Sequence, residues 1–212
     1  PLLGTLKAVA DAHIGDAGNP HGYLALGQFL YQHASSGRDK LTLLRPEQLA
    51  MLGTWSEQLF EESLGKDGKG LTLFPDEDLT VDDLKPVAEN DRVFLWVRIE
   101  GEASPETELA AQVKARGYPV WEVTLKSADE LPSLLYGLEK TVASFAWLWN
   151  INPVDQPAVE GYKDKTRQVM QAAGDQDPLA QRLDQAQRVV TDPSGLTLVY
   201  DSLDEPLRHR LD

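Results

Sequence analysis

Two adjacent glutamates, Glu61 and Glu62, stand where a predicted helix over residues 46–63 meets the glycine-rich run GKDGKG at 65–70. A carboxylate at a helix end, beside a flexible loop, can reach into a cleft and accept a proton from a substrate. The alternative is that both glutamates are solvated helix residues. A P-loop is excluded, because the run lacks the Gly-x-x-x-x-Gly-Lys-Ser/Thr spacing and follows a helix instead of preceding one.

A second polar segment reads NPVDQPAVEGYK, over residues 152–163. Asp155 or Asn152 could simply cap a following helix that has Pro157 in its first turn. Gln156 and Lys163 are two helical turns apart, so a helix over 156–172 would present both on one face. Two hydrogen-bond donors on one face suit a sugar phosphate, and we keep both interpretations open.

Other chemistries find little support in the sequence. The segment GRDKLT at 37–42 is typical of a turn before a core strand. The chain shows no Ser-His-Asp arrangement and no Gly-x-Gly-x-x-Gly run, and we expect no cofactor. We also expect no metal site, because the histidines are scattered without ligand spacing: His13, His21, His33 and His209.

Composition narrows the class of protein. The formal net charge is −14, with 34 acidic against 20 basic residues, so nucleic acid should be repelled. An anionic substrate would need a local pocket of positive potential. There is no cysteine, which excludes disulfides and thiolate chemistry and fits a cytoplasmic protein. The longest apolar stretch, residues 141–149, is far shorter than the roughly 20 residues of a membrane span, so no membrane partner is expected.

Hydrophobic patterning predicts the elements that position these residues. Strands are expected at 41–44, 71–74, 92–99 and 120–125, where short runs are rich in apolar and β-branched residues. Helices are expected at 22–34, 46–63, 105–116 and 129–149. This order predicts an α/β domain, a three-layer sandwich whose mostly parallel sheet is covered on both faces.

The sequence changes character after residue 152. We expect helices at 156–172 and about 178–190, a strand at 196–200 and a charged tail. The predicted division is a lead-in helix and loop at 1–21, the α/β domain at 22–152, and a truncated helical C-terminal extension at 153–212. The chain opens at Pro1, and we expect the true N-terminus to lie elsewhere.

Both polar segments resemble signatures of one enzyme family. Residues 62–66, ESLGK, resemble the Glu-Ser-x-Gly-Lys signature of phosphoglucose isomerases. Residues 151–163, INPVDQPAVEGYK, resemble the second signature, Asn-x-Phe-Asp-Gln-x-Gly-Val-Glu-x-x-Lys. The wider run WSEQLFEESLGKDGKGL and the segment GRDKLTLL are similar to the versions found in transaldolase/phosphoglucose isomerase fusions. The resemblance extends more loosely from about residue 19 to residue 163.

The resemblance implies a sugar-isomerase (SIS-type) domain that interconverts glucose 6-phosphate and fructose 6-phosphate without a metal. By position, Glu62 corresponds to the catalytic carboxylate that carries a proton between C1 and C2 through a cis-enediol. Partial burial can raise the pKa of a glutamate so that it does this near neutral pH. Lys163 corresponds to the lysine implicated in ring opening, and Gln156 to a substrate-contacting glutamine.

The same resemblance implies partners. In the family two such domains face each other across the site, and this chain would be the second. The missing N-terminal isomerase domain would supply the serine and threonine phosphate cradle and the catalytic arginine, neither of which we find in residues 1–50. A preceding transaldolase domain and a homodimer are further expectations.

The chain departs from the family pattern at three places. Val154 and Ala158 replace the Phe and Gly of the second signature, and no histidine lies between Ser63 and Asn152, where common isomerases have one for ring opening. Two other hypotheses therefore remain: a sugar-phosphate-binding regulatory module without catalysis, and a generic α/β interaction domain.

Overall fold

The computed structural model describes residues 4, 7, 9, 11, 13, 19, 21–172, 188–191 and 197–200. The chain divides into two compact units, Pro1–Gln156 and Pro157–Asp212. The boundaries predicted from the sequence, at residues 21 and 152, remain a prediction. No helix in the described ranges combines the length and apolar character needed to cross a membrane.

The first unit is built on a four-stranded sheet in which every neighbouring pair is parallel. The strands are β1 (Lys40–Leu44), β2 (Thr72–Phe74), β3 (Arg92–Ile99) and β4 (Val120–Leu125), in the spatial order β2-β1-β3-β4. The four predicted strands are confirmed to within one residue, because short apolar runs between polar turns are a reliable sign of buried parallel strands.

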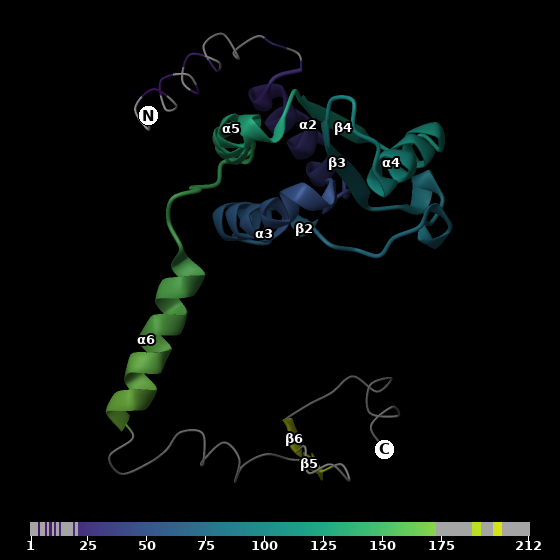
Figure 1. Ribbon diagram of the computed structural model, residues 1–212. Coiled ribbons are helices and arrows are strands. Elements are labelled where there is room, and N and C mark those ends of the chain that lie inside the picture. Colours follow the sequence, from purple (N-terminus) through teal and green to yellow (C-terminus); the bar gives the residue numbers. More distant parts are fainter. Residues whose placement is uncertain are drawn as a thin grey trace. The chain divides into compact units, whose positions relative to one another are not determined.

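Helices cover both faces of this sheet (Figure 1). On one face lie α2 (Tyr23–Ser35), α3 (Ala50–Leu64) and α5 (Leu131–Trp149). On the other lie α4 (Pro105–Ala115) and the connection between β2 and β3, which holds the 3-10 turns Val81–Asp83 and Val87–Glu89. Further 3-10 turns, Glu47–Leu49 and Ala128–Glu130, lead into α3 and α5.

The handedness of parallel crossovers explains this division. The chain moves outward from β1 to β2 through α3, and in the opposite direction from β3 to β4 through α4. Right-handed crossovers in opposite directions place their helices on opposite faces. The expected three-layer α/β sandwich is therefore confirmed, and its sheet is wholly parallel in the described strands.

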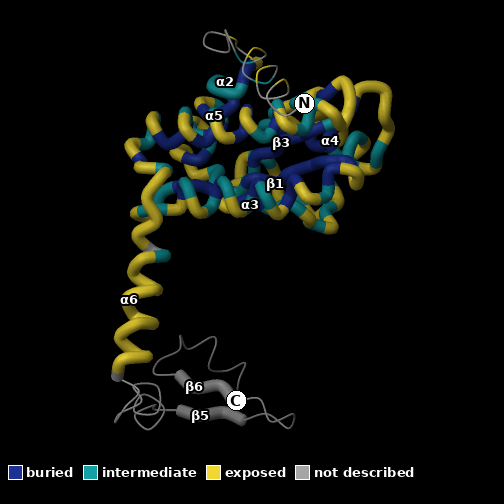
Figure 2. The backbone as a smooth tube through the Cα atoms, turned by 60° about the vertical axis from the view of Figure 1, so that its left-hand side comes forward, coloured by how far each residue is buried: buried dark blue, intermediate teal, exposed yellow. Residues whose placement is uncertain are grey.

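The core centres on β3, whose residues Val93–Val97 are all buried. Val93, Leu95 and Val97 pack toward α2, α3 and α5, while Phe94 and Trp96 pack toward α4. In Figure 2 β1 and β3 run dark blue between helices whose outer surfaces are yellow. Burial of each large apolar side chain stabilises the fold by about 1.5–3 kcal/mol.

Close packing joins α2 to α5. A methyl group built on Gly27 would lie 2.5 Å from the Thr141 backbone oxygen and 2.7 Å from Ser144 Cβ. Two hydroxyl groups of α5 also donate hydrogen bonds to α2 carbonyls, Thr141 to Tyr23 at 3.0 Å and Ser144 to Leu24 at 2.9 Å. This pair of helices therefore forms a fixed wall on one face of the sheet.

The second unit contains α6 (Pro157–Ala172) and a hairpin of β5 (Arg188–Thr191) with β6 (Thr197–Tyr200). The predicted helix at 178–190 is wrong at its end, because residues 188–190 pair with β6 as a strand. Val189, Val190 and Thr191 are β-branched, which favours a strand. Residues 178–187 and the charged tail at 201–212 lie outside the described residues.

We predict that Gly27→Ala lowers the free energy of unfolding by about 1–3 kcal/mol, because the new methyl group forces α2 away from α5. Urea unfolding of the chain measures this change. Gln28→Ala is the matched control on the exposed side of the same helix, and should alter stability by less than about 0.5 kcal/mol. Equal changes of stability in Gly27→Ala and Gln28→Ala would show that α2 and α5 are not closely packed at Gly27.

Candidate functional site

The two adjacent glutamates at the end of α3 have different surroundings. The Glu61 carboxylate turns back on the sheet and accepts a hydrogen bond from the Leu73 backbone N–H of β2 at 3.1 Å. Glu62 is exposed. The partial burial expected to tune this carboxylate is therefore not supplied by the first unit. Glu61 has a structural task, whereas Glu62 is accessible to a ligand.

The structure brings Gln156 to Glu62. The side-chain amide Nε2 of Gln156 donates to the Glu62 Oε2 at 3.0 Å, although the two residues are 94 positions apart in sequence. Gln156 directly precedes α6, which begins at Pro157. The helix that carries Lys163 therefore starts one residue later than predicted, and a shared face of Gln156 and Lys163 remains a prediction.

The segment that delivers Gln156 starts with a sharp turn at the end of α5. Asn150 has a left-handed backbone, with φ 54° and ψ 53°, a conformation that asparagine adopts more readily than most residues. The N–H of Ile151 then bonds to the Ala146 carbonyl at 2.8 Å. Asn152 Oδ1 accepts from the Val154 N–H at 3.2 Å, which is a local turn.

Two lysines of the glycine-rich loop hold this segment from the α3 side. Lys66 Nζ donates to the carbonyl oxygens of Asn152, at 2.5 Å, and of Asp155, and forms an ion pair with Asp155 Oδ1 at 3.0 Å. Lys69 Nζ donates to the Trp149 carbonyl at 3.2 Å. The C-terminal carbonyls of a helix are left without helical partners and favour cations.

Lys163, the third predicted site residue, lies on α6 in the second unit. Its ammonium group forms an ion pair with Glu160 at 2.8 Å, one turn away on the same helix. This hydrogen bond, with the negative charge of Glu160, raises the pKa of Lys163 and lowers that of Glu160.

The contacts of Glu61, Lys66 and Lys69 in the first unit lie at the amino edge of the sheet. The helix α3 runs back from β1 and ends next to the start of β2, as the Glu61–Leu73 hydrogen bond shows. Ligands of open α/β sheets more often bind outside the carboxyl ends of the strands. The sequence signal that could have indicated the lysine contacts is the pair of lysines in the glycine-rich run.

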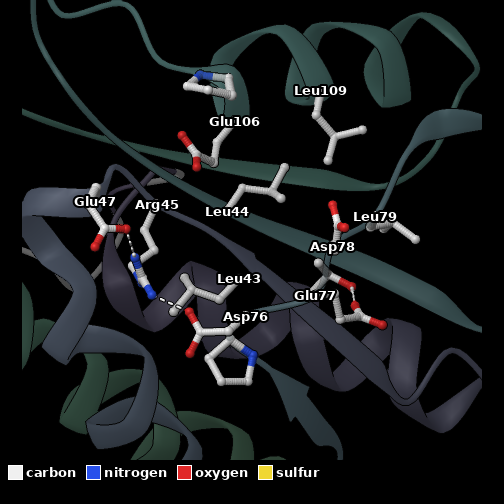
Figure 3. Close-up of a pocket in the computed structure, with 13 residues that line it drawn as sticks. Leu43, Leu44, Arg45, Glu47, Asp76, Glu77, Asp78, Leu79, Glu106 and Leu109 are labelled. Carbon is white, nitrogen blue, oxygen red and sulfur yellow. Dashed lines mark hydrogen bonds and ion pairs between the residues drawn. The ribbon is translucent and has the colours of Figure 1, made fainter.

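The carboxyl edge of the sheet holds a different cavity, of about 380 Å³ (Figure 3). Five of the thirteen residues that line it are acidic, and its arginine is already paired: Arg45 contacts the carboxylates of Asp76 and, at 4.0 Å, Glu47. Close by, Arg92 donates to both carboxylate oxygens of Glu77, with one distance of 2.8 Å. The cavity therefore does not suit an anionic sugar phosphate, and none of the predicted site residues lines it.

Metal chemistry finds no ready site in the part of the chain that the structure describes. No group of three or more histidine, aspartate or glutamate side chains there is arranged to hold a metal ion.

Comparison with curated proteins confirms the resemblance seen in the two signatures. The chain is similar to glucose-6-phosphate isomerases. The relative from Lactobacillus gasseri is 28% identical over an alignment of 210 residues, which covers 74% of this chain and 44% of the relative. The relative from Leptospira biflexa is 31% identical over 146 residues, covering 52% of this chain and 32% of the relative. The chain thus spans less than half the length of either.

The fold has a counterpart among solved structures. A hypothetical protein from Thermus thermophilus superimposes with a TM-score of 0.54 at 22% identity, over 67% of this chain and 43% of that one. This likeness supports the α/β fold alone. No protein-family model matches the chain.

We predict that Glu61→Ala lowers the free energy of unfolding by about 1–2 kcal/mol, because the Leu73 N–H loses a charged acceptor. The neighbouring change Glu62→Ala should cost less than about 0.5 kcal/mol, since this side chain is exposed. Urea unfolding of the two variants side by side measures the difference. A larger loss of unfolding free energy in Glu62→Ala than in Glu61→Ala would contradict a structural role for Glu61.

Proposed function

We propose that this chain is the half of a glucose-6-phosphate isomerase that carries the catalytic base. The observation that supports it most is the contact between Glu62 and Gln156. Two segments that resemble separate signatures of one enzyme family meet at a hydrogen bond of 3.0 Å. The printed names of the curated relatives point to the same reaction.

In the proposed reaction the Glu62 carboxylate removes the proton from C2 of the open-chain aldose phosphate. The electron pair of the broken C–H bond forms the C1–C2 double bond of a cis-enediol, and the carbonyl oxygen at C1 gains a proton. Return of the proton from Glu62 to C1, with loss of the O2 proton, gives the ketose. Neither redox cofactor nor metal is needed for this transfer, which is general acid–base chemistry.

The polar neighbours have distinct proposed tasks. The Gln156 amide, which donates to Glu62, can orient this carboxylate or donate instead to a substrate oxygen. Lys163 is the proposed donor for ring opening. Its ammonium group carries N–H donors for the ring oxygen.

A complete site requires more than the described residues of this chain provide. Glu62 is exposed, and the net charge of −14 opposes an anionic substrate. We therefore propose that a second sugar-isomerase-type domain covers the amino edge and supplies the phosphate grip. Binding energy from the phosphate contributes to the rate of the chemical step, so loss of that domain should lower turnover as well as affinity. A homodimer and an accompanying transaldolase domain remain predictions.

A regulatory module that binds sugar phosphate without catalysis is the second candidate. The absence of histidine between Ser63 and Asn152 favours it, since the resemblance implies a ring-opening histidine there. Retention of a glutamate at position 62 favours the enzyme, because a module that only binds sugar phosphate has no need of a base.

We predict that Glu62→Gln lowers isomerase turnover by about 10²–10⁴-fold, because the amide cannot accept the C2 proton. The measurement is a coupled assay of fructose 6-phosphate conversion, on the 212-residue chain and on the protein extended upstream. Glu61→Gln is the matched control: it keeps a side-chain oxygen for the Leu73 N–H and should leave turnover close to that of the unaltered protein.

Activity confined to the longer protein and lost in Glu62→Gln would support the proposal. Full activity in Glu62→Gln would exclude Glu62 as the base. If neither length is active while fructose 6-phosphate binds, the regulatory module becomes the better explanation.

A further inference from the structure

The hydrogen bond between Gln156 and Glu62 cannot by itself fix the geometry of the pair. Both side chains are exposed, and water competes for each of their polar groups, so the net free energy of such a contact is small. The distance between amide and carboxylate is therefore set by the backbone that carries each residue.

The hydrophobic core holds only one end of the segment that carries Gln156. Ile151 is buried and packs in the core beneath α5. Beyond it, Asn152, Val154, Asp155 and Gln156 are all exposed. Apolar packing therefore stops before the residues that must approach Glu62, and another contact has to hold them.

Lys66 provides that contact. An ammonium group has three N–H donors, and here three acceptors receive them: the carbonyl oxygens of Asn152 and Asp155 and the Asp155 carboxylate at 3.0 Å. All three acceptors belong to residues 152–155. The Lys66 side chain is only 9% exposed, and loss of one partner from such a pair leaves the other charge without compensation.

The covalent position of Lys66 makes this contact relevant to the pair. Lys66 is four residues beyond Glu62, just past the end of α3, and Asp155 directly precedes Gln156. One buried ammonium group thus joins the two backbone segments from which the carboxylate and the amide extend.

We propose that Lys66 is a positioning residue, whose ammonium group fixes residues 152–155 against the end of α3 and so sets the Gln156 amide on the Glu62 carboxylate. Its role in catalysis rests on the proposed function, but its effect on this geometry does not.

The first test follows the Gln156 side-chain amide signal by NMR in the 212-residue chain during a pH titration. In the unaltered chain this signal should respond to ionisation of Glu62, and Glu62→Gln defines the response without that carboxylate. In Lys66→Met the response should fall to the Glu62→Gln level, while the backbone amide signals of β1, β3 and β4 stay in place.

Lys69→Met is the matched control. It removes a lysine from the same loop, but one that contacts only the Trp149 carbonyl among the hydrogen bonds of the described residues. The Gln156 response should persist in this variant. An unchanged response in Lys66→Met, or an equal loss in both variants, would overturn the proposal.

Asp155→Ala is a second test of positioning by Lys66, for the case in which Lys66→Met does not fold. This change removes the ion pair and leaves both carbonyl acceptors, so the Gln156 response should weaken. A response identical to that of the unaltered chain would count against positioning by Lys66.

A kinetic test applies in the longest protein that is active in the coupled assay. Lys66→Met should lower kcat by up to about 100-fold with KM close to that of the unaltered protein, as expected for misplaced catalytic groups. Lys66→Arg keeps the charge and should recover much of the rate. If Lys66→Met loses the NMR response but keeps its kcat, Lys66 positions Gln156 but this position does not affect catalysis. If Glu62→Gln keeps its isomerase activity, the proposed reaction is wrong, but the positioning of Gln156 by Lys66 is not affected.

Discussion

The parallel sheet of the first unit has to be covered on both faces, because its central strand β3 exposes apolar side chains to each of them. Of the helices on one face, α3 joins the parallel strands β1 and β2 and must run antiparallel to them, and α5 returns along the same face from the end of β4. The ends of α3 and α5 therefore arrive at the same edge of the sheet, the amino edge. The contact between Glu62 and Gln156 follows from this arrangement of the helix ends. Lys66 and Lys69, in the loop after α3, then hold the segment after α5 in place.

Much of this architecture follows from the sequence. The runs at 92–99 and 120–125 are apolar enough to be recognised as buried strands, and glycine ends the helix over 105–115 at Gly117. The strand at 188–191 is predicted as the end of a helix, because it is only four residues long and its strand form depends on pairing with β6.

The candidate site shows the same limit more clearly. A resemblance selects Glu62, Gln156 and Lys163, but only the strand order β2-β1-β3-β4 brings the first two together. The sequence also does not predict that Glu61 is hydrogen-bonded while Glu62 is exposed, since this depends on which carboxylate faces the Leu73 N–H. Equally, the burial of Lys66 depends on carbonyl oxygens 86 and 89 residues away, and no composition or spacing rule reports such a contact.

The ion pairs of Arg45 and Arg92 have a practical consequence. Arg45 and Arg92 fix the connection after β2 through Asp76 and Glu77, and the next residue, Asp78, is exposed. The chain contains no cysteine, so a thiol introduced at position 78 would be unique. A spin label or fluorophore attached there sits on a firmly held loop, away from the contacts of Glu62 and Gln156. It would serve as a fixed reference point for measuring distances to any protein that docks on the opposite edge.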